Sequence, residues 1–323
     1  RFGSVTTGEF AREFRDPFLR EVFARIFAWP DVPILGVIMT LAGLHTRRSG
    51  RPSGGSLAFA QAIEQRYRSL GGTLHYRCPV AKILIEHDRA VGVRLADGRE
   101  LRADIVISAA DGRRTLFEML DGKYLTDEIR THYRETQVTR GVLQVSLGVA
   151  RDLSGTPAST VYCAEAPLIE AGDRPQVVTV KHFCMDKGMA PAGKSTVVVE
   201  YTADYDYWNT LHDADPEGYR AEKERVAAGA IALLEKNHPG LATQVEVVDV
   251  PTPVTAERYT GSWQGSPMGF NPRVNRKSSA AMQAGGLTRT LPGLENFYMV
   301  GQWAPSGGVG HRDGQLFMTQ PAA

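Results

Sequence analysis

The sequence has few cysteines, almost no net charge and no long apolar run, and each shortage narrows the classes of protein to consider. Its three cysteines, Cys78, Cys163 and Cys184, lie far apart and form no CxxC pair, so the pattern supports neither a zinc site nor a disulfide framework. We therefore expect a reducing, cytoplasmic environment. Lysine and arginine total 37 against 36 for aspartate and glutamate, so no global field attracts nucleic acid. No apolar run approaches the roughly 20 residues that span a bilayer.

The motifs of common hydrolases and metalloenzymes are also missing. The sequence contains no G-x-S-x-G segment, which a nucleophile elbow requires. Its eight histidines form neither H-E-x-x-H nor His-x-His, the spacings that bring two imidazoles to one metal. The sequence therefore predicts no metal site, and it identifies no catalytic acid, base or nucleophile.

The composition is that of a globular protein of about two domains. The 323 residues correspond to two units of roughly 150 residues each. Hydrophobic residues make up 42% and charged residues 23%, which is close to globular averages and excludes extensive disorder. Near the beginning, Asp16-Pro17 has the order of a helix cap and a first helical residue.

The segment Val32–Leu44 is strongly apolar, and His45, Arg47, Arg48 and Arg51 follow it. Two interpretations stay open. The segment is a buried helix packed closely through its glycines, or it is a lipid-facing helix with a basic flank. The second interpretation predicts peripheral membrane contact through residues 32–51.

Residues 51–120 predict one helix followed by short strands. Ser56 is the expected cap of the helix, and Gly71-Gly72 is its expected left-handed end. The apolar pattern then predicts strands at 73–76, 80–86, 90–95 and 100–103, joined by tight turns at 87–89 and 97–98 as an antiparallel meander. A buried strand at 104–108 comes next and ends in small residues, and a helix at 113–120 follows it.

Residues 121–285 have a different character and predict a second domain around a mixed sheet. Apolar residues alternate along 143–149, so that one face of this strand is bulky and the other is small and partly polar. Further strands are predicted at 177–183, 196–201 and 244–250. A long amphipathic helix is predicted at 216–237, and residues 260–286 have the composition of a long loop.

The last part of the chain predicts a strand followed by glycine-rich turns. Residues 297–300 are short and apolar, as central parallel strands are, so we expect them in one sheet with 104–108. The later Gly308-Val309-Gly310 and Gly314 do not form a dinucleotide fingerprint, because only nine residues follow Gly314. Either this is a turn that opens a helix, whose N-terminus favours nearby negative charge, or it is an ordinary tight turn.

The order of these segments resembles a known family of flavoproteins. The landmarks are the Gly-Gly-Ser turn with its helix, V-A-K-I at 80–83, A-V-G-V at 90–93, A-D-I-V-I-S-A-A-D at 103–111 and L-E-N-F-Y-M-V-G-Q-W at 294–303. Together they resemble the C-terminal two-thirds of phytoene desaturase and carotenoid isomerase-like enzymes, in the amine-oxidase-type FAD superfamily. The resemblance implies an FAD-dependent oxidoreductase acting on a lipophilic, carotenoid-like substrate.

The resemblance also implies a fold and a division of the chain. The implied fold is α/β: a split FAD-binding Rossmann-like domain, incomplete at the N-terminus and carrying the β-meander, plus a mixed α+β substrate domain. Residues 51–120 and 286–323 would form the FAD domain. Residues 121–285 would form the substrate domain, and the helical residues 1–50 would belong to its cap region.

The cofactor contacts that the resemblance implies fall in four short segments. The backbone of Val80 would contact the adenine, and Ser108 and Ala109 would lie beside the dinucleotide. The turn of Gly301, Gln302 and Trp303 would approach the ribityl chain and pyrophosphate. Gly307, Gly308 and Val309 would face the pyrimidine ring of the flavin. The family pattern P-G-G-G-[LIV]-P differs here at Ser306 and Gly310.

The family's opening strand–GxGxxG–helix unit has no counterpart in this sequence. A pyrophosphate needs converging N–H donors from such a loop. We therefore expect a polypeptide of only these 323 residues to bind FAD poorly by itself. Two alternatives to the desaturase or isomerase remain. One is a flavin-free binding protein on the same architecture, like the Rab GDP-dissociation inhibitors, and the other is a flavin amine oxidase.

Overall fold

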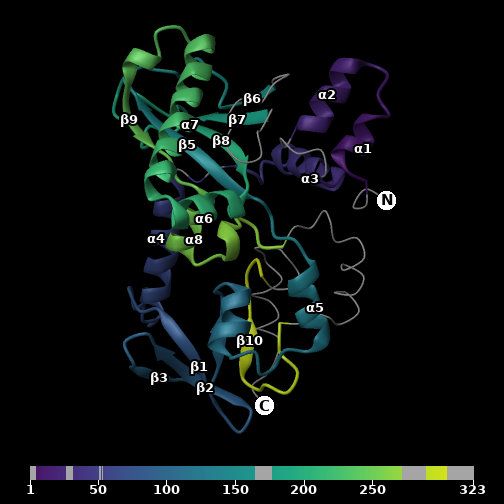
Figure 1. Cartoon of the computed structure of the whole chain (residues 1–323), viewed down its shortest axis with the longest axis vertical. Helices are drawn as coiled ribbons and strands as arrows, with labels where there is room; N and C mark the ends of the chain where they lie inside the picture. Colours follow the sequence, from purple (N-terminus) through teal and green to yellow (C-terminus); the bar gives the residue numbers. More distant parts are fainter. Residues whose placement is uncertain are drawn as a thin grey trace. The chain divides into compact units, whose positions relative to one another are not determined.

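The computed structural model describes residues 5–26, 32–50, 52, 54–163, 177–270 and 289–303. The chain divides into two compact units (Figure 1). The first unit joins Arg1–Leu74 to Gly141–Thr255, and the second joins His75–Arg140 to Ala256–Ala323. Among the described residues, no helix combines the length and the hydropathy that crossing a membrane requires.

The second unit contains the predicted meander. Strands β1 (Val80–Glu86), β2 (Arg89–Leu95) and β3 (Glu100–Arg102) form an antiparallel sheet in that order. The hairpin between β1 and β2 turns at His87 and Asp88, which both have positive φ, of 50° and 59°. This is the geometry that matches the twist of a two-residue hairpin. The expected strand at 73–76 is wrong, because these residues form no strand.

A parallel pair of short strands stands beside the meander in the same core. Strand β4 (Val106–Ser108) pairs with β10 (Phe297–Met299), which confirms that these distant segments share one sheet. The Ala90 N–H donates to the Glu295 carbonyl at 2.9 Å, which links the meander to the approach of β10. Ala90, Val106 and Phe297 belong to one buried apolar cluster.

Two helices and a helical turn lie in the described part of the second unit, besides the end of the helix at 253–260. The predicted helix after β4 is a π-helix, η1 (Arg114–Met119), and α5 (Asp127–Glu135) follows it. Leu116 and Ile129 are buried in the same cluster as β4 and β10. Within the predicted loop at 260–286, the described residues include the 3₁₀ turn η3 (Trp263–Gly265).

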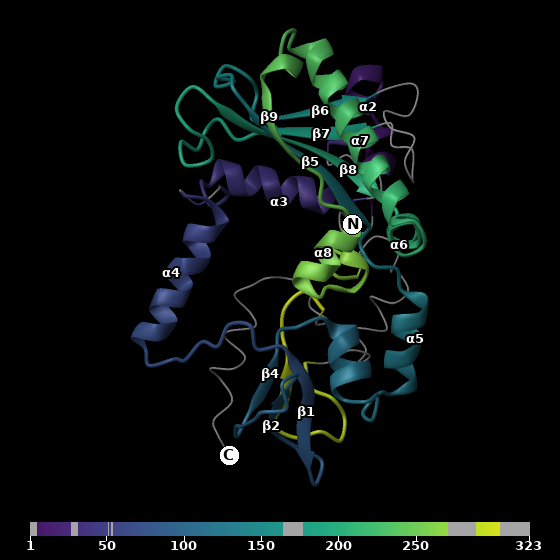
Figure 2. The ribbon, with the colours of Figure 1, turned by 60° about the vertical axis from the view of Figure 1, so that its left-hand side comes forward.

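The first unit is built on a five-stranded sheet with the order β6-β7-β8-β5-β9 (Figure 2). All four pairings are antiparallel, so the expectation of a mixed sheet is wrong. One residue in two along β5 is buried, as the alternation at 143–149 predicted, and β8 shows the same burial pattern. The strands are β5 (Gly141–Val149), β6 (Ser159–Cys163), β7 (Val177–His182), β8 (Ser195–Ala203) and β9 (Val245–Asp249).

Helix α7 (Pro216–Asn237) covers one face of this sheet (Figure 2). Asp215 caps it by accepting the Gly218 N–H at 2.9 Å, and Pro216 is its first residue, as predicted. Val226, Ala230 and Leu234 are buried against the strands. The first unit also contains α6 (Tyr205–Ala214) and η2 (Ala242–Gln244), and α8 (Pro253–Thr260) crosses the boundary between the two units.

The described residues that precede the sheet in the first unit form four helices: α1 (Thr7–Ala11), α2 (Pro17–Arg25), α3 (Ile34–His45) and α4 (Gly55–Ser69). The Asp16 carboxylate caps α2 as predicted, accepting the Phe18 and Leu19 N–H groups at 2.8 and 3.1 Å. The expected cap at Ser56 is wrong, because Gly54, with φ of 81°, occupies the cap position of α4.

Candidate cofactor site

The carboxyl ends of β4 and β10 lie side by side and bring two predicted segments together. Ser108 is paired with Met299, and the Val300 N–H donates to the Ser108 carbonyl at 2.9 Å. Ligands of parallel sheets bind outside the carboxyl ends of the strands. This edge, with Ser108 at the end of one strand, Ala109 just after it and Gly301 after the other strand, is therefore the candidate cofactor site.

The turn at Gly301 fits a flat cofactor that approaches the backbone. Gly301 has φ of 92°, a conformation that glycine adopts without steric cost. A Cβ built on it would meet, among the described residues, only the Ala109 carbonyl oxygen, at 4.0 Å. As far as the described residues extend, the missing side chain therefore leaves room for a ligand group beside the two strand ends.

The Ser108 side chain forms a hydrogen bond within the protein. Ser108 is buried, and its hydroxyl lies 2.8 Å from the Thr115 hydroxyl at the start of η1. This bond ties the end of β4 to the helix that follows it. Ala109 is exposed, so the backbone around Ala109 is the part of this segment that a cofactor can reach.

Trp303 anchors the turn in the core of the second unit. It is only 4% exposed, and its ring meets the Phe270 ring edge-on, with centroids 5.2 Å apart. The Trp263 ring is tilted against it at 6.3 Å. Gln302 is half-buried, and a Cβ on Gly269 would lie 2.7 Å from its carbonyl oxygen. Residues 263–270 therefore pack directly against the turn.

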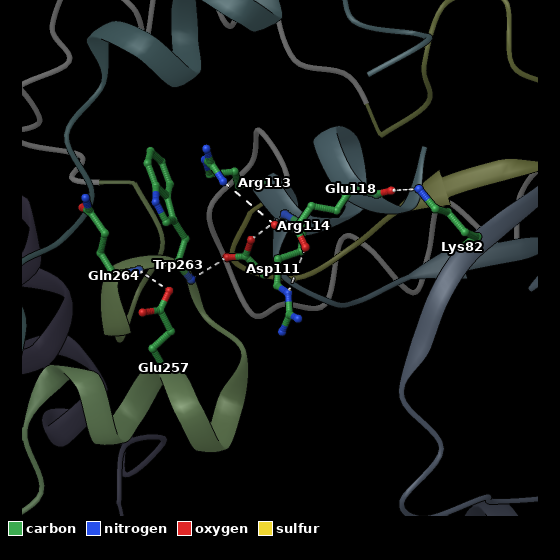
Figure 3. Close-up of polar contacts among 8 residues, drawn as sticks. All are labelled: Lys82, Asp111, Arg113, Arg114, Glu118, Glu257, Trp263 and Gln264. Carbon is green, nitrogen blue, oxygen red and sulfur yellow. Dashed lines mark hydrogen bonds and ion pairs between the residues drawn. The ribbon is translucent and has the colours of Figure 1, made fainter. Parts of the chain in front are cut away.

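A buried carboxylate lies just beyond the end of β4 (Figure 3). Asp111 is 6% exposed, and its two oxygens accept the backbone N–H groups of Arg114 at 2.9 Å and of Trp263 at 2.8 Å. Burial raises the pKa of the Asp111 carboxyl, and these two donors oppose the shift only in part. Asp111 thus connects the start of η1 to a segment more than 150 residues later in the chain.

Two buried side chains of α5 border the same aromatic cluster. The His132 and Tyr133 rings lie 4.3 and 5.0 Å from the Phe270 ring. Burial lowers the pKa of His132 and raises the pKa of Tyr133, so both are uncharged near neutral pH. The His132 Nε2 and the Tyr133 hydroxyl have no hydrogen-bond partner among the described residues.

The remaining predicted contacts lie elsewhere. Val80 is the half-buried first residue of β1, in the meander, and pairs with Leu95. It therefore belongs to a different sheet from β4 and β10. Gly307, Gly308 and Val309 lie outside the described residues, as does the glycine turn of which they are part.

A groove of about 470 Å³ over the meander has charged walls. Lys123 pairs there with Asp88 at 2.9 Å, and Lys82 pairs with Asp121. Exposed pairs of this kind contribute about 1 kcal/mol or less, and Arg94 also lines the groove. Across the described ranges, no three His, Cys, Asp or Glu side chains gather as a metal-binding group.

No motif in the sequence assigned a role to Asp111, Trp263 or Phe270. Asp111 appeared in the sequence only as the last residue of the motif at 103–111. The two aromatic residues lie in a stretch rich in glycine, serine and proline, whose composition indicates a loop. Two large aromatic residues within so polar a stretch were the available signal that it packs into a core.

Two carotenoid enzymes are among the relatives of the chain. The chloroplastic prolycopene isomerase of Arabidopsis thaliana is 28% identical over 274 residues, which cover 84% of this chain and 44% of the relative. The neurosporene-forming phytoene desaturase of Cereibacter sphaeroides is 25% identical over 238 residues, 68% of this chain and 44% of the relative. The chain therefore spans less than half the length of these relatives.

A structural match and a family match agree with these relatives. A solved putrescine oxidase has a TM-score of 0.58 at 13% identity, over 98% of this chain and 67% of that chain. At this identity the likeness shows the fold alone, a mixed α/β fold of flavin-dependent oxidoreductases. Residues 6–309 match the family of flavin-containing amine oxidoreductases. The predicted resemblance is therefore confirmed, and the chain belongs to this family of FAD-binding proteins, on its phytoene desaturase-like side.

Proposed function

We propose that the protein containing this chain is an FAD-dependent oxidoreductase, of the desaturase, dehydrogenase or isomerase type, that acts on a lipophilic, carotenoid-like substrate. The observation that carries the proposal is the juxtaposition of Ser108–Ala109 and Gly301–Trp303 at the carboxyl ends of two parallel strands. The names of the prolycopene isomerase and phytoene desaturase relatives support the substrate class.

In this proposal the parallel strands belong to a split Rossmann-like domain formed by residues 51–120 and 286–323. Bound FAD supplies hydride or electron transfer, while the protein positions and tunes it. The backbone at Ala109 and Gly301 holds the dinucleotide, and the buried Trp303 keeps water from the rear of the turn. Val80 would contact the adenine, and Gly307, Gly308 and Val309, which lie outside the described residues, would bind the flavin ring.

The proposal assigns the substrate to residues 121–285, with residues 1–50 as its cap. The face of β5 opposite the core carries Gln144, Ser146 and Gly148, which are half-buried. On this face Gln144 donates to Glu200 at 3.1 Å, and a Cβ on Gly148 would lie 3.2 Å from the Val247 Cβ, so the names of the relatives alone support the substrate class. We retain this assignment as a proposal about the substrate, separate from the cofactor site.

We also propose that α3 brings the protein to a membrane surface. Its apolar side chains are unusually exposed for a helix of a globular protein: Leu35, Ile38, Met39, Leu41 and Leu44 are 41% to 65% exposed. Arg47 and Arg48, just after the helix, are exposed as well. An apolar stripe with a basic flank favours the interface of an anionic bilayer.

The test uses the full-length protein in its purified form. Its absorption spectrum and the cofactor released on denaturation are measured first, and the protein is then incubated with phytoene or prolycopene in liposomes. We expect a yellow protein that releases FAD and converts the carotenoid. A colourless protein that takes up no FAD would contradict the proposal and favour a flavin-free binder. Flavin reduction by amines, without carotenoid conversion, would favour an amine oxidase.

A further inference from the structure

The segment Ser262–Phe270 is held in one conformation by its own hydrogen bonds. The Ser262 hydroxyl donates to the Ser266 carbonyl at 2.7 Å, and the Ser266 hydroxyl donates to the Gly269 carbonyl at 2.8 Å. Both serines are at least nine-tenths buried. We call residues 262–270 the buttress segment.

The buttress segment is tied to the rest of the second unit at both ends. At its start, the Trp263 N–H donates to Asp111, as Figure 3 shows. At its end, the Thr139 N–H donates to the Gly269 carbonyl at 2.8 Å, and Phe270 forms an antiparallel bridge with Val138. Neither attachment lies in the neighbouring sequence, so the segment is placed by tertiary contacts.

Between these ends, the buttress segment supports the turn at Gly301–Trp303 from the side of the core. Trp263 and Phe270 both contact the Trp303 ring. Gly269 comes so close to Gln302 that a Cβ would lie 2.7 Å from its carbonyl oxygen. Movement of the buttress segment would therefore move the backbone that faces the candidate site.

Asp111 is suited to hold this arrangement because it provides two acceptors in a buried place. One oxygen accepts the Arg114 N–H and the other accepts the Trp263 N–H. An amide of the same shape offers one oxygen and one NH₂ group, so it would leave one of these N–H donors facing another donor. The next residue, Gly112, packs so closely on Trp303 that a Cβ would lie 2.9 Å from the Trp303 Cβ.

We propose that Asp111 is a positioning residue for the flavin cofactor. Its carboxylate fixes the buttress segment, the buttress segment fixes Trp303, and Trp303 sets the distance between Gly301 and Ala109 at the two strand ends. Asp111 acts through these residues and needs no contact with the cofactor. The inference rests on the proposed function, because it assumes that FAD lies against these strand ends.

The experiment compares the wild-type holoenzyme with Asp111→Asn and with Phe270→Leu, which weakens the same support without altering the carboxylate. Val199→Ala, in the buried core of the first unit, is the control for a general loss of stability. For each protein we would measure the dissociation constant for FAD, the absorption spectrum of the bound flavin and its reduction potential.

The proposal expects Asp111→Asn to weaken FAD binding about tenfold, which corresponds to about 1.4 kcal/mol, and to shift the flavin spectrum and reduction potential. Phe270→Leu should change the same three quantities in the same direction. If Asp111→Asn does not fold, the result for Phe270→Leu tests the proposal. Val199→Ala should lower the melting temperature and leave all three unchanged.

Two results would overturn the proposal, and they are distinguishable. If wild type and both site variants bind FAD equally well, with the same spectrum and potential, Asp111 has only a structural role and the proposed function is unaffected. If the wild-type protein binds no flavin, the proposed function fails and the inference fails with it.

Discussion

The five-stranded sheet of the first unit and the parallel pair of the second unit are held in place by different means. In the first, strands of five to nine residues pair along their length, and alternate side chains form a large apolar core. In the second, β4 and β10 have three residues each, and their surroundings depend on Asp111 and on aromatic residues from distant segments. The sheet is therefore stabilised by many strand hydrogen bonds and by apolar burial, whereas the candidate site depends on a few specific contacts.

The largest effect should come from the core of the sheet. Trp208 is 1% exposed and belongs to the apolar cluster beneath the strands. We expect Trp208→Ala to lower the free energy of unfolding by about 3–5 kcal/mol, because burial and packing are both lost. Urea denaturation measures this loss. Met185→Ala, at an 82% exposed position of the same unit, is the control. A loss below 1 kcal/mol for Trp208→Ala would show that the cluster is not the main source of stability.

A smaller but more specific effect should come from Gly112. A Cβ there would overlap the Tyr133 hydroxyl and crowd Trp303, so Gly112→Ala should cost about 1–3 kcal/mol through overpacking. It should also weaken FAD binding, measured by titration of the apoprotein. Gly155→Ala is the matched control, since nothing lies within 4 Å of a Cβ at that position. Equal effects of the two substitutions would refute the close packing between Gly112 and Trp303.

Charge reversal after α3 tests the membrane proposal. Each arginine near an anionic surface contributes about 1 kcal/mol, so Arg47→Glu with Arg48→Glu should reduce co-sedimentation with anionic liposomes. Arg220→Glu, at an exposed position of α7, should leave binding nearly unchanged. Binding that is absent in the wild type, or equal in all variants, would indicate that α3 has no membrane role.

The smallest expected effect is a pH dependence shared by both units. Burial lowers the pKa of His182 in the first unit, with a further contribution from His238, and burial lowers the pKa of His132 in the second. The unfolded chain therefore binds more protons than the folded protein below a pH of about 6.5, and stability should fall as the pH drops through this value. His182→Leu and His132→Leu should each make the urea midpoint less dependent on pH. An unchanged slope would mean that these histidines titrate alike in both states.

The sequence predicted those parts of the fold that depend on local signals. Helix α7 spans Pro216–Asn237, the range that the amphipathic pattern predicted. The pairing of β4 with β10 was also predictable, because both strands are short, apolar and followed by small residues. Strand direction in the five-stranded sheet was not, since direction depends on connections that alternation does not encode.

The support of the candidate site could not be predicted in the same way. The end segments of β4 and β10 were identified, but the buttress segment has the composition of a loop. Its attachment to the rest of the unit depends on Asp111 and Thr139, which lie more than 120 residues earlier in the chain. Pairings at such separations leave no periodicity in the sequence, so neither Trp263 nor Phe270 could be assigned to the site.

The central claim is that FAD lies against the carboxyl ends of β4 and β10. Hydrogen exchange, followed by mass spectrometry on the full-length protein with and without FAD, tests it directly. We expect the cofactor to slow exchange in peptides that contain residues 109–112 and 300–303, while peptides from the first unit's β8 exchange equally in both forms. Slowing confined to other segments, with these two unchanged, would contradict the account.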